Sequence, residues 1–282
     1  MWADTIVRFI EEQEVFGAVA QRLQPRVSGL FKTGQSGQRL KNYLNGTWLG
    51  HPLHPVLTDI PIGAWTIALL FDCISMDAAA DTAIALGITA ALASAITGIV
   101  DWSDTYGRAQ RIGVAHAVLN ITGTALYAAS LISRKKRRGF GKLLSFMGYG
   151  VLNGGAFLGG ELVYGQQIGV NHVAAQELPS DFIAVLPEAQ LSRDTLTRVD
   201  ASGVAVLLVR GNEGIRALLE TCSHLGGPLA EGTLEEGTVR CPWHGSRFCL
   251  ETGAVVDGPA TYSQPRFETR VKDGQIEVRA VR

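Results

Sequence analysis

Four long apolar segments constrain the fold of this chain more than any other feature of its sequence. They cover residues 56–74, 82–100, 112–132 and 143–164. Each has about 19 to 22 residues, which is enough for an α-helix to cross the hydrocarbon core of a lipid bilayer. The connections between them are short, and this argues against a soluble all-α core. We therefore predict a four-helix transmembrane bundle over residues 51–166, in an integral, multi-pass protein of the bacterial cytoplasmic membrane.

The segments on either side of the apolar runs have a different character. In residues 1–50, apolar residues recur at helical spacing among charged ones as far as Pro25, which predicts an amphipathic helical segment that ends at the proline. Residues 167–177 are interpreted as a linker. Residues 178–282 contain short alternating stretches, such as residues 197–210, that are separated by Gly, Pro and Asp. This pattern predicts an all-β domain.

The charge distribution argues against nucleic-acid binding. The chain has 25 Lys and Arg residues against 26 Asp and Glu residues. It contains no basic stretch interleaved with aromatic residues of the kind that nucleic-acid-binding surfaces show. We therefore expect no nucleic-acid partner.

Two short pairs of cysteine and histidine mark the predicted β domain. They are Cys222-Ser-His224 and Cys241-Pro-Trp-His244. Structural zinc sites more often use Cys-x-x-Cys with a distant histidine pair. Here each loop provides one thiolate and one imidazole, which suits a dinuclear iron centre with both thiolates on one iron and both imidazoles on the other. A mononuclear zinc site remains the alternative.

The residues around these pairs, CSHLGG and CPWHGS, resemble the two cluster-binding loops of the Rieske [2Fe–2S] family. The resemblance implies a [2Fe–2S] cluster in which Cys222 and Cys241 hold the inner iron. It implies that His224 and His244 hold the outer iron, near the tip of the domain.

The same resemblance implies roles for residues next to the cluster. Leu225 would shield it from the first loop, and Pro259 would belong to a third loop that covers it. Ser246 matches the position whose hydroxyl donates a hydrogen bond to a cluster sulfide.

Three residues depart from the Rieske proteins of cytochrome bc complexes. Gly227 and Trp243 stand where those proteins have the cysteines of a disulfide, and Phe248 stands where a tyrosine would donate a hydrogen bond. Because hydrogen bonds to the sulfur atoms stabilise the extra electron, we expect a potential in the lower part of the family range of roughly −150 to +300 mV.

Ionisable residues also gather toward one predicted face of the membrane domain, where burial of a charge is costly. They are His51, His54, Asp59, His116, Glu161 and His172. Four interpretations stay open. His116 and either His54 or His172 are axial ligands of a haem b, the group binds a metal, Asp59 and Glu161 belong to a proton or quinol site, or these residues cap helices and pair with one another.

The segment His51-Pro-Leu-His54-Pro resembles the HP-x-HP motif of an uncharacterised family of four-helix membrane domains. This resemblance covers roughly residues 40–170 and implies a fold but no function.

The basic run at residues 134–138 predicts the orientation. By the positive-inside rule it lies in the cytoplasm, which places the β domain on the extracytoplasmic side. Residues 137–142 also resemble the twin-arginine signal Arg-Arg-x-Phe-x-Lys, which directs export of proteins that are already folded. Basic residues such as Arg108 and Arg111 would then lie outside, and they argue for the opposite orientation.

These features together predict an α-helical transmembrane four-helix bundle followed by an all-β Rieske [2Fe–2S] domain. We expect a membrane-anchored iron–sulfur protein that exchanges single electrons with a redox protein or a quinone. No catalytic residue is assigned. A Rieske oxygenase would need a second iron site of two histidines and one carboxylate, and no substrate domain follows to hold it. The alternatives are a quinol-linked redox subunit, with a haem or quinone site in the membrane domain, and a redox sensor.

Overall fold

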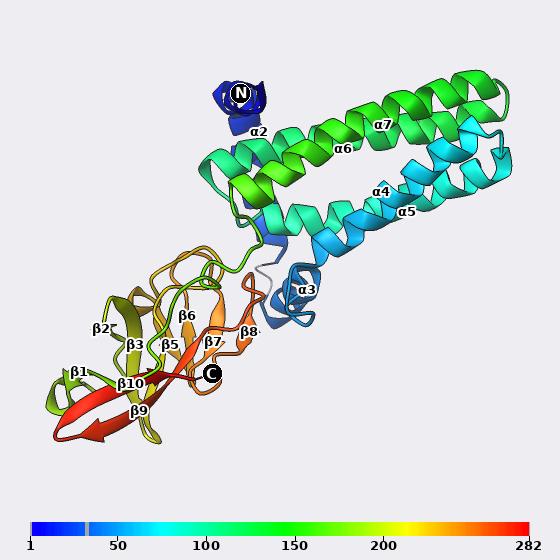
Figure 1. Ribbon diagram of the computed structural model, residues 1–282. Coiled ribbons are helices and arrows are strands. Elements are labelled where there is room, and N and C mark those ends of the chain that lie inside the picture. Colours follow the sequence, from blue (N-terminus) through cyan, green and yellow to red (C-terminus); the bar gives the residue numbers. More distant parts are fainter. Residues whose placement is uncertain (1, 32–33, 282) are drawn as a thin grey trace. The chain divides into compact units, whose positions relative to one another are not determined.

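The computed structural model describes residues 2–31 and 34–281 (Figure 1). The outer ends of the predicted segments, at residues 1 and 282, lie outside this description. The chain forms two compact units. We call residues 1–37 with 52–168 the helical unit, and residues 38–51 with 169–282 the β unit.

Helices form two hairpins in the helical unit. Helix α4 packs mainly on α5, and α6 packs mainly on α7. A stack between Trp65 of α4 and Tyr127 of α6, with ring centroids 4.5 Å apart, joins the hairpins in a buried apolar core. The bounds are α1 (Trp2–Glu12), α2 (Glu14–Leu30), α4 (Leu53–Cys73), α5 (Asp77–Trp102), α6 (Gly107–Arg134) and α7 (Arg138–Gly160), followed by a turn of π-helix at Glu161–Gly165.

Three helices of the described chain, α4, α5 and α6, are long and apolar enough to cross a membrane. They correspond to the first three predicted spans. The fourth predicted span lies in α7, which has 23 residues, is rich in glycine and is not one of these three. It nevertheless exposes large apolar side chains such as Leu143 and Phe146.

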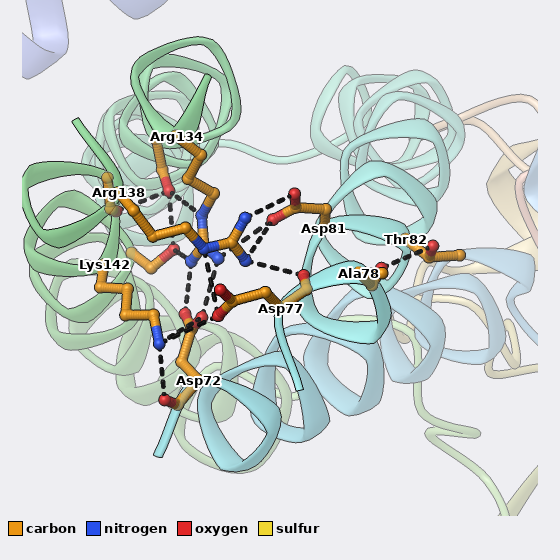
Figure 2. A network of polar contacts seen from close by, with 11 residues as sticks. Asp72, Asp77, Ala78, Asp81, Thr82, Arg134, Arg138 and Lys142 are labelled. Atoms are coloured by element: carbon orange, nitrogen blue, oxygen red, sulfur yellow. Dashed lines mark hydrogen bonds and ion pairs between the residues drawn. The ribbon is translucent and has the colours of Figure 1, made fainter. Parts of the chain in front are cut away.

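A network of ion pairs connects the hairpins at the α4–α5 and α6–α7 turns (Figure 2). At its centre the guanidinium of Arg134 contacts Asp72 through two nitrogens and Asp81 through one. Both side chains of the Arg134–Asp72 pair are almost fully buried, at 1% and 6% exposure. Arg138 and Lys142, from the first turns of α7, complete the network by pairing with Asp77. Arg134, Arg138 and Lys142 are therefore compensated by the aspartates at this face.

The first fifty residues differ from the prediction in two ways. The helix does not end at Pro25, because α2 continues through the proline to Leu30. Ala20 and Val27, on either side of the proline, are buried, and α2 packs against α6. This packing offsets the hydrogen bond that a proline removes from a helix. In addition, helix α3 (Gly34–Asn45) begins a segment whose residues 38–51 pack with the β unit.

Two antiparallel sheets make up the β unit. One has six strands in the order β1-β10-β9-β4-β3-β2, and the other has four in the order β5-β6-β7-β8. The bounds are β1 (Ile183–Pro187), β2 (Thr197–Ala201), β3 (Val204–Gly211), β4 (Gly214–Leu219), β5 (Thr233–Glu235), β6 (Thr238–Arg240), β7 (Arg247–Cys249), β8 (Val255–Asp257), β9 (Arg266–Lys272) and β10 (Gln275–Ala280), with short 3-10 turns at Glu188–Gln190 and Leu229–Glu231.

Strand β3 shows why both faces of the larger sheet are covered. Val206 and Leu208 point into one apolar core, and the alternate residues Leu207 and Val209 point into another. The period of two places successive side chains on opposite faces. The second core also contains Cys222 and Cys241, so it supports the two cysteine–histidine loops directly.

Candidate metal centre

The two cysteine–histidine loops have the same main-chain structure. In each, the cysteine N–H donates to the carbonyl five residues later, and its carbonyl accepts from the N–H four residues later. The bonds are Cys222 to Gly227 (2.8 Å), Gly226 to Cys222 (2.9 Å), Cys241 to Ser246 (2.8 Å) and Gly245 to Cys241 (3.1 Å). The glycines at the fourth position, Gly226 and Gly245, have φ of 76° and 77°, which favours glycine. Each loop therefore presents its cysteine and histidine from an equivalent turn.

The cysteines lie close together beneath the loops. Both thiols are free and buried. The thiol of Cys222 donates a hydrogen bond to Cys241, which lowers the pKa of Cys241 to about 7 and raises that of Cys222. Main-chain N–H groups of His224 and Leu225 point at the sulfur of Cys222 and act against the rise in its pKa. Such N–H donors stabilise negative charge on thiolate ligands.

The histidines lie next to each other as well. The ring centroids of His224 and His244 are 5.0 Å apart, with an interplanar angle of 81°. Burial lowers the pKa of His224 to about 3 and that of His244 to about 4, so both imidazoles are neutral at physiological pH. The Nδ1 atom of His224 is buried and has no hydrogen-bond partner. A buried polar atom of this kind requires an explanation, and a metal ligand, which must be a neutral imidazole nitrogen, provides one.

These four side chains form two pairs. Within residues 2–31 and 34–281, no group of three or more His, Cys, Asp or Glu side chains could hold a single metal ion. A tetrahedral zinc site needs four donors around one point. One pair of thiols and one pair of imidazoles instead fit a dinuclear centre, so the geometry favours the iron–sulfur interpretation.

Residues predicted to surround the cluster lie in or next to the two loops. Ser246 is fully buried, and its hydroxyl accepts a hydrogen bond from the N–H of Ala260 at 2.9 Å. This bond ties the second loop to a third one, which contains Pro259. Phe248 is fully buried in the same core as both cysteines. Leu225 is partly buried in the first loop.

Gly227 and Trp243, at the positions of the absent disulfide, lie side by side. A Cβ atom on Gly227 would be 2.8 Å from the sulfur of Cys241 and 3.2 Å from the Trp243 ring. The glycine therefore leaves room for the indole, which is 51% exposed. The two loops therefore contact each other here through the Trp243 ring and Gly227.

The ionisable residues of the membrane domain fall into two groups. His54 and His116 belong to the helical unit, whereas His51 and His172 belong to the β unit. The main-chain N–H of His172 donates to the carbonyl of Ser223, in the first loop. In the helical unit, Asp59 is exposed on α4, and Glu161 accepts a hydrogen bond from Gln166 at 2.9 Å.

Sequence reasoning missed a contribution from residues 38–51, where Asn42 contacts the third loop. No motif in the sequence marks it, because the two segments are separated by more than 200 positions in the chain.

The comparisons with known proteins match the two units separately. Residues 181–268 match the family model described as Rieske [2Fe-2S] domain, and residues 50–172 match Predicted membrane protein (DUF2231).

Two ferredoxins are related over most of their own length. The chain is 34% identical to Ferredoxin CarAc of Metapseudomonas resinovorans over 98 residues, which are 34% of this chain and 92% of the ferredoxin. It is 36% identical over 95 residues to the 3-phenylpropionate/cinnamic acid dioxygenase ferredoxin subunit of Escherichia coli K12. These residues are 33% of this chain and 89% of that subunit.

Apoptosis-inducing factor 3 of Homo sapiens is 36% identical over 104 residues, 36% of this chain, but the chain spans only 17% of its length. Among solved structures, the ferredoxin of carbazole 1,9a-dioxygenase from Nocardioides aromaticivorans IC177 is 28% identical, with 36% of this chain and 98% of that one covered and a TM-score of 0.34. The family match implies a [2Fe–2S] cluster. Through its β unit, this chain belongs to the Rieske [2Fe–2S] family, with a helical unit that matches the DUF2231 predicted membrane proteins.

Proposed function

We propose that this protein is a membrane-anchored Rieske protein that transfers single electrons at a membrane surface. The observation that carries the proposal is the presence, in one chain, of paired thiols and imidazoles on two equivalent loops and of helices long enough to span a bilayer. Two relatives that match over most of their own length are ferredoxins, and one of them is a dioxygenase subunit. A redox protein is accordingly the partner that we favour.

Within this proposal, Cys222 and Cys241 hold one iron, and His224 and His244 hold the other. The bound cluster accepts and releases one electron. The protein contributes N–H donors aimed at the thiolates and an apolar core behind them. His244 is half-buried beside the exposed Trp243, so the imidazole side is the route for electron exchange.

The helical unit supplies the anchor. We propose that α7 is a fourth span beside α4, α5 and α6, and that the β unit lies on the extracytoplasmic side. In the β unit, Tyr43 and Trp48 stack at 5.8 Å and are 60% and 59% exposed. Exposed aromatic residues of this kind are typical of the interface between membrane and water.

Spectroscopy on the full chain in its membrane tests this function. We expect the protein to remain in alkali-washed membranes and to give a Rieske electron paramagnetic resonance signal after reduction. The midpoint potential should lie in the lower part of the range of roughly −150 to +300 mV, because Phe248 lacks a hydroxyl. Protease added to intact spheroplasts should digest the β unit. A soluble protein, or one without the signal, would refute the proposal, and a protected β unit would reverse the orientation alone.

One observation favours a second candidate function, a haem-containing redox subunit. The Nδ1 atom of His54 in α4 lies 2.9 Å from the carbonyl of Ser94 in α5. The Nδ1 atom of His116 in α6 lies 2.8 Å from the carbonyl of Gly155 in α7. A carbonyl only accepts, so each Nδ1 carries the proton and each Nε2 carries the lone pair. This is how metal-ligating histidines are usually oriented.

In each hairpin, the histidine ring of one helix also packs against a glycine of the other helix. A Cβ atom on Gly98 would be 2.7 Å from the His54 ring, and one on Gly159 would be 3.1 Å from the His116 ring. One imidazole from each hairpin is a ligand set that suits a haem b within a helix bundle. The Asn120 amide, 3.2 Å from Nε2 of His116, would have to move.

The haem hypothesis predicts a pyridine haemochrome spectrum from the purified full chain. The spectrum should disappear in His54→Ala and His116→Ala and persist in His51→Ala, because His51 belongs to the β unit. Retention of haem in both helical-unit variants, or its absence from the unsubstituted protein in cells with ample haem, would overturn the hypothesis.

A further inference from the structure

Residues 38–51, which we call the cap segment, pack against the third loop of the β unit. Asn42 makes two hydrogen bonds there. Its Nδ2 donates to the carboxylate of Asp257 at 2.9 Å, and its Oδ1 accepts from the N–H of Gly258 at 3.0 Å. Gln38 donates to the same Oδ1 at 2.9 Å, which fixes the orientation of the amide. One side chain of the cap segment therefore binds both the carboxylate of Asp257 and the N–H of Gly258.

The packing at this point is tight. A Cβ atom on Gly258 would lie 3.0 Å from the methyl group of Thr47. Thr47 is itself held by a hydrogen bond from its hydroxyl to the carbonyl of Asn42 at 3.0 Å. Any larger residue at position 258 would therefore require the Thr47 methyl group to shift away from the loop.

The third loop in turn contacts the second cysteine–histidine loop. The N–H of Ala260 donates to Ser246 at 2.9 Å, and Arg247 pairs with Asp257 at 3.0 Å. Only Gly258 and Pro259 separate Asp257, a partner of Asn42, from Ala260 in the sequence. The third loop therefore connects Asn42 to Ser246 and Arg247.

The cap segment lies outside the residues 181–268 that match the Rieske family model. We propose that Asn42 is a positioning residue for the cluster, because it fixes the third loop next to the second cysteine–histidine loop. The proposal rests on the proposed function.

Removal of the Asn42 amide from the detergent-solubilised full chain tests this role. Asn42→Ala should broaden or shift the electron paramagnetic resonance signal and increase the rate at which a chelator removes iron. The matched control Asn212→Ala removes an exposed amide that bonds to Arg193, and it should change neither. Circular dichroism shows whether both variants fold alike. A folded Asn42→Ala protein with an unchanged signal and unchanged iron loss would contradict the proposal, whereas an unsubstituted protein with no cluster signal at all would refute the proposed function instead.

Discussion

Replacement of Cys222 by alanine is expected to abolish the [2Fe–2S] cluster completely. One iron would lose half of its protein ligands, and the remaining thiol of Cys241 cannot hold it alone. His224→Ala should have the same outcome at the other iron, because its Nδ1 is the buried atom without a partner. Iron and acid-labile sulfide content, together with the visible spectrum of the purified full chain, measure the loss.

The other two cysteines provide matched controls. Cys73 is exposed at the end of α4, and Cys249 is half-buried in β7. Cys73→Ala and Cys249→Ala should keep the full iron content. Iron retained in Cys222→Ala would contradict the ligand assignment. Stoichiometric zinc in place of iron in the unsubstituted protein would support the mononuclear alternative.

Loss of Arg134 should cost the most stability of any single change in the helical unit. Its guanidinium binds Asp72 and Asp81 and also donates to Ser145 at 2.9 Å (Figure 2). Arg134→Leu would leave the buried carboxylate of Asp72 without this partner. Breaking a buried ion pair from one side costs about 3–5 kcal/mol. We expect a destabilisation of that order, measured by unfolding of the purified protein in mixed detergent micelles.

A double-mutant cycle separates the pair from its surroundings. Because Asp72→Leu together with Arg134→Leu removes both charges, the double variant should be more stable than Arg134→Leu alone. The exposed Arg137 gives the control, since Arg137→Leu removes a charge at the same turn without burying another. A double variant that is as unstable as the sum of the single ones would show that the pair is not coupled.

The ion-pair network also changes how the basic run is interpreted. Arg138 and Lys142, which complete the twin-arginine-like pattern, pair with Asp81 and Asp77 at the start of α5. Their presence therefore has a structural reason in the folded protein. The exposed positive charge at the α6–α7 turn comes from Lys135, Lys136 and Arg137. These three residues are the exposed basic charges that the positive-inside rule places in the cytoplasm.

The sequence alone specifies the elements that depend on residues close together in the chain, namely the cluster-loop turns, the long helices and the strands. The spacing of Cys222 and His224, with a glycine four residues after the cysteine, specifies a turn closed by its own main chain. Apolar length specifies α4 to α6, and alternation specifies strands such as β3. These signals act within a few residues, so they can be recognised without knowing the tertiary structure.

Contacts between distant segments were decided by the tertiary structure alone. Asn42 meets Gly258 across 216 positions, and Arg134 meets Asp72 across 62. The continuation of α2 through Pro25 likewise depends on burial against α6. No periodicity encodes which polar side chains meet, because that depends on how whole elements pack. The chemistry of the cluster loops was therefore visible in the sequence, whereas the residues placed around them became visible only in the fold.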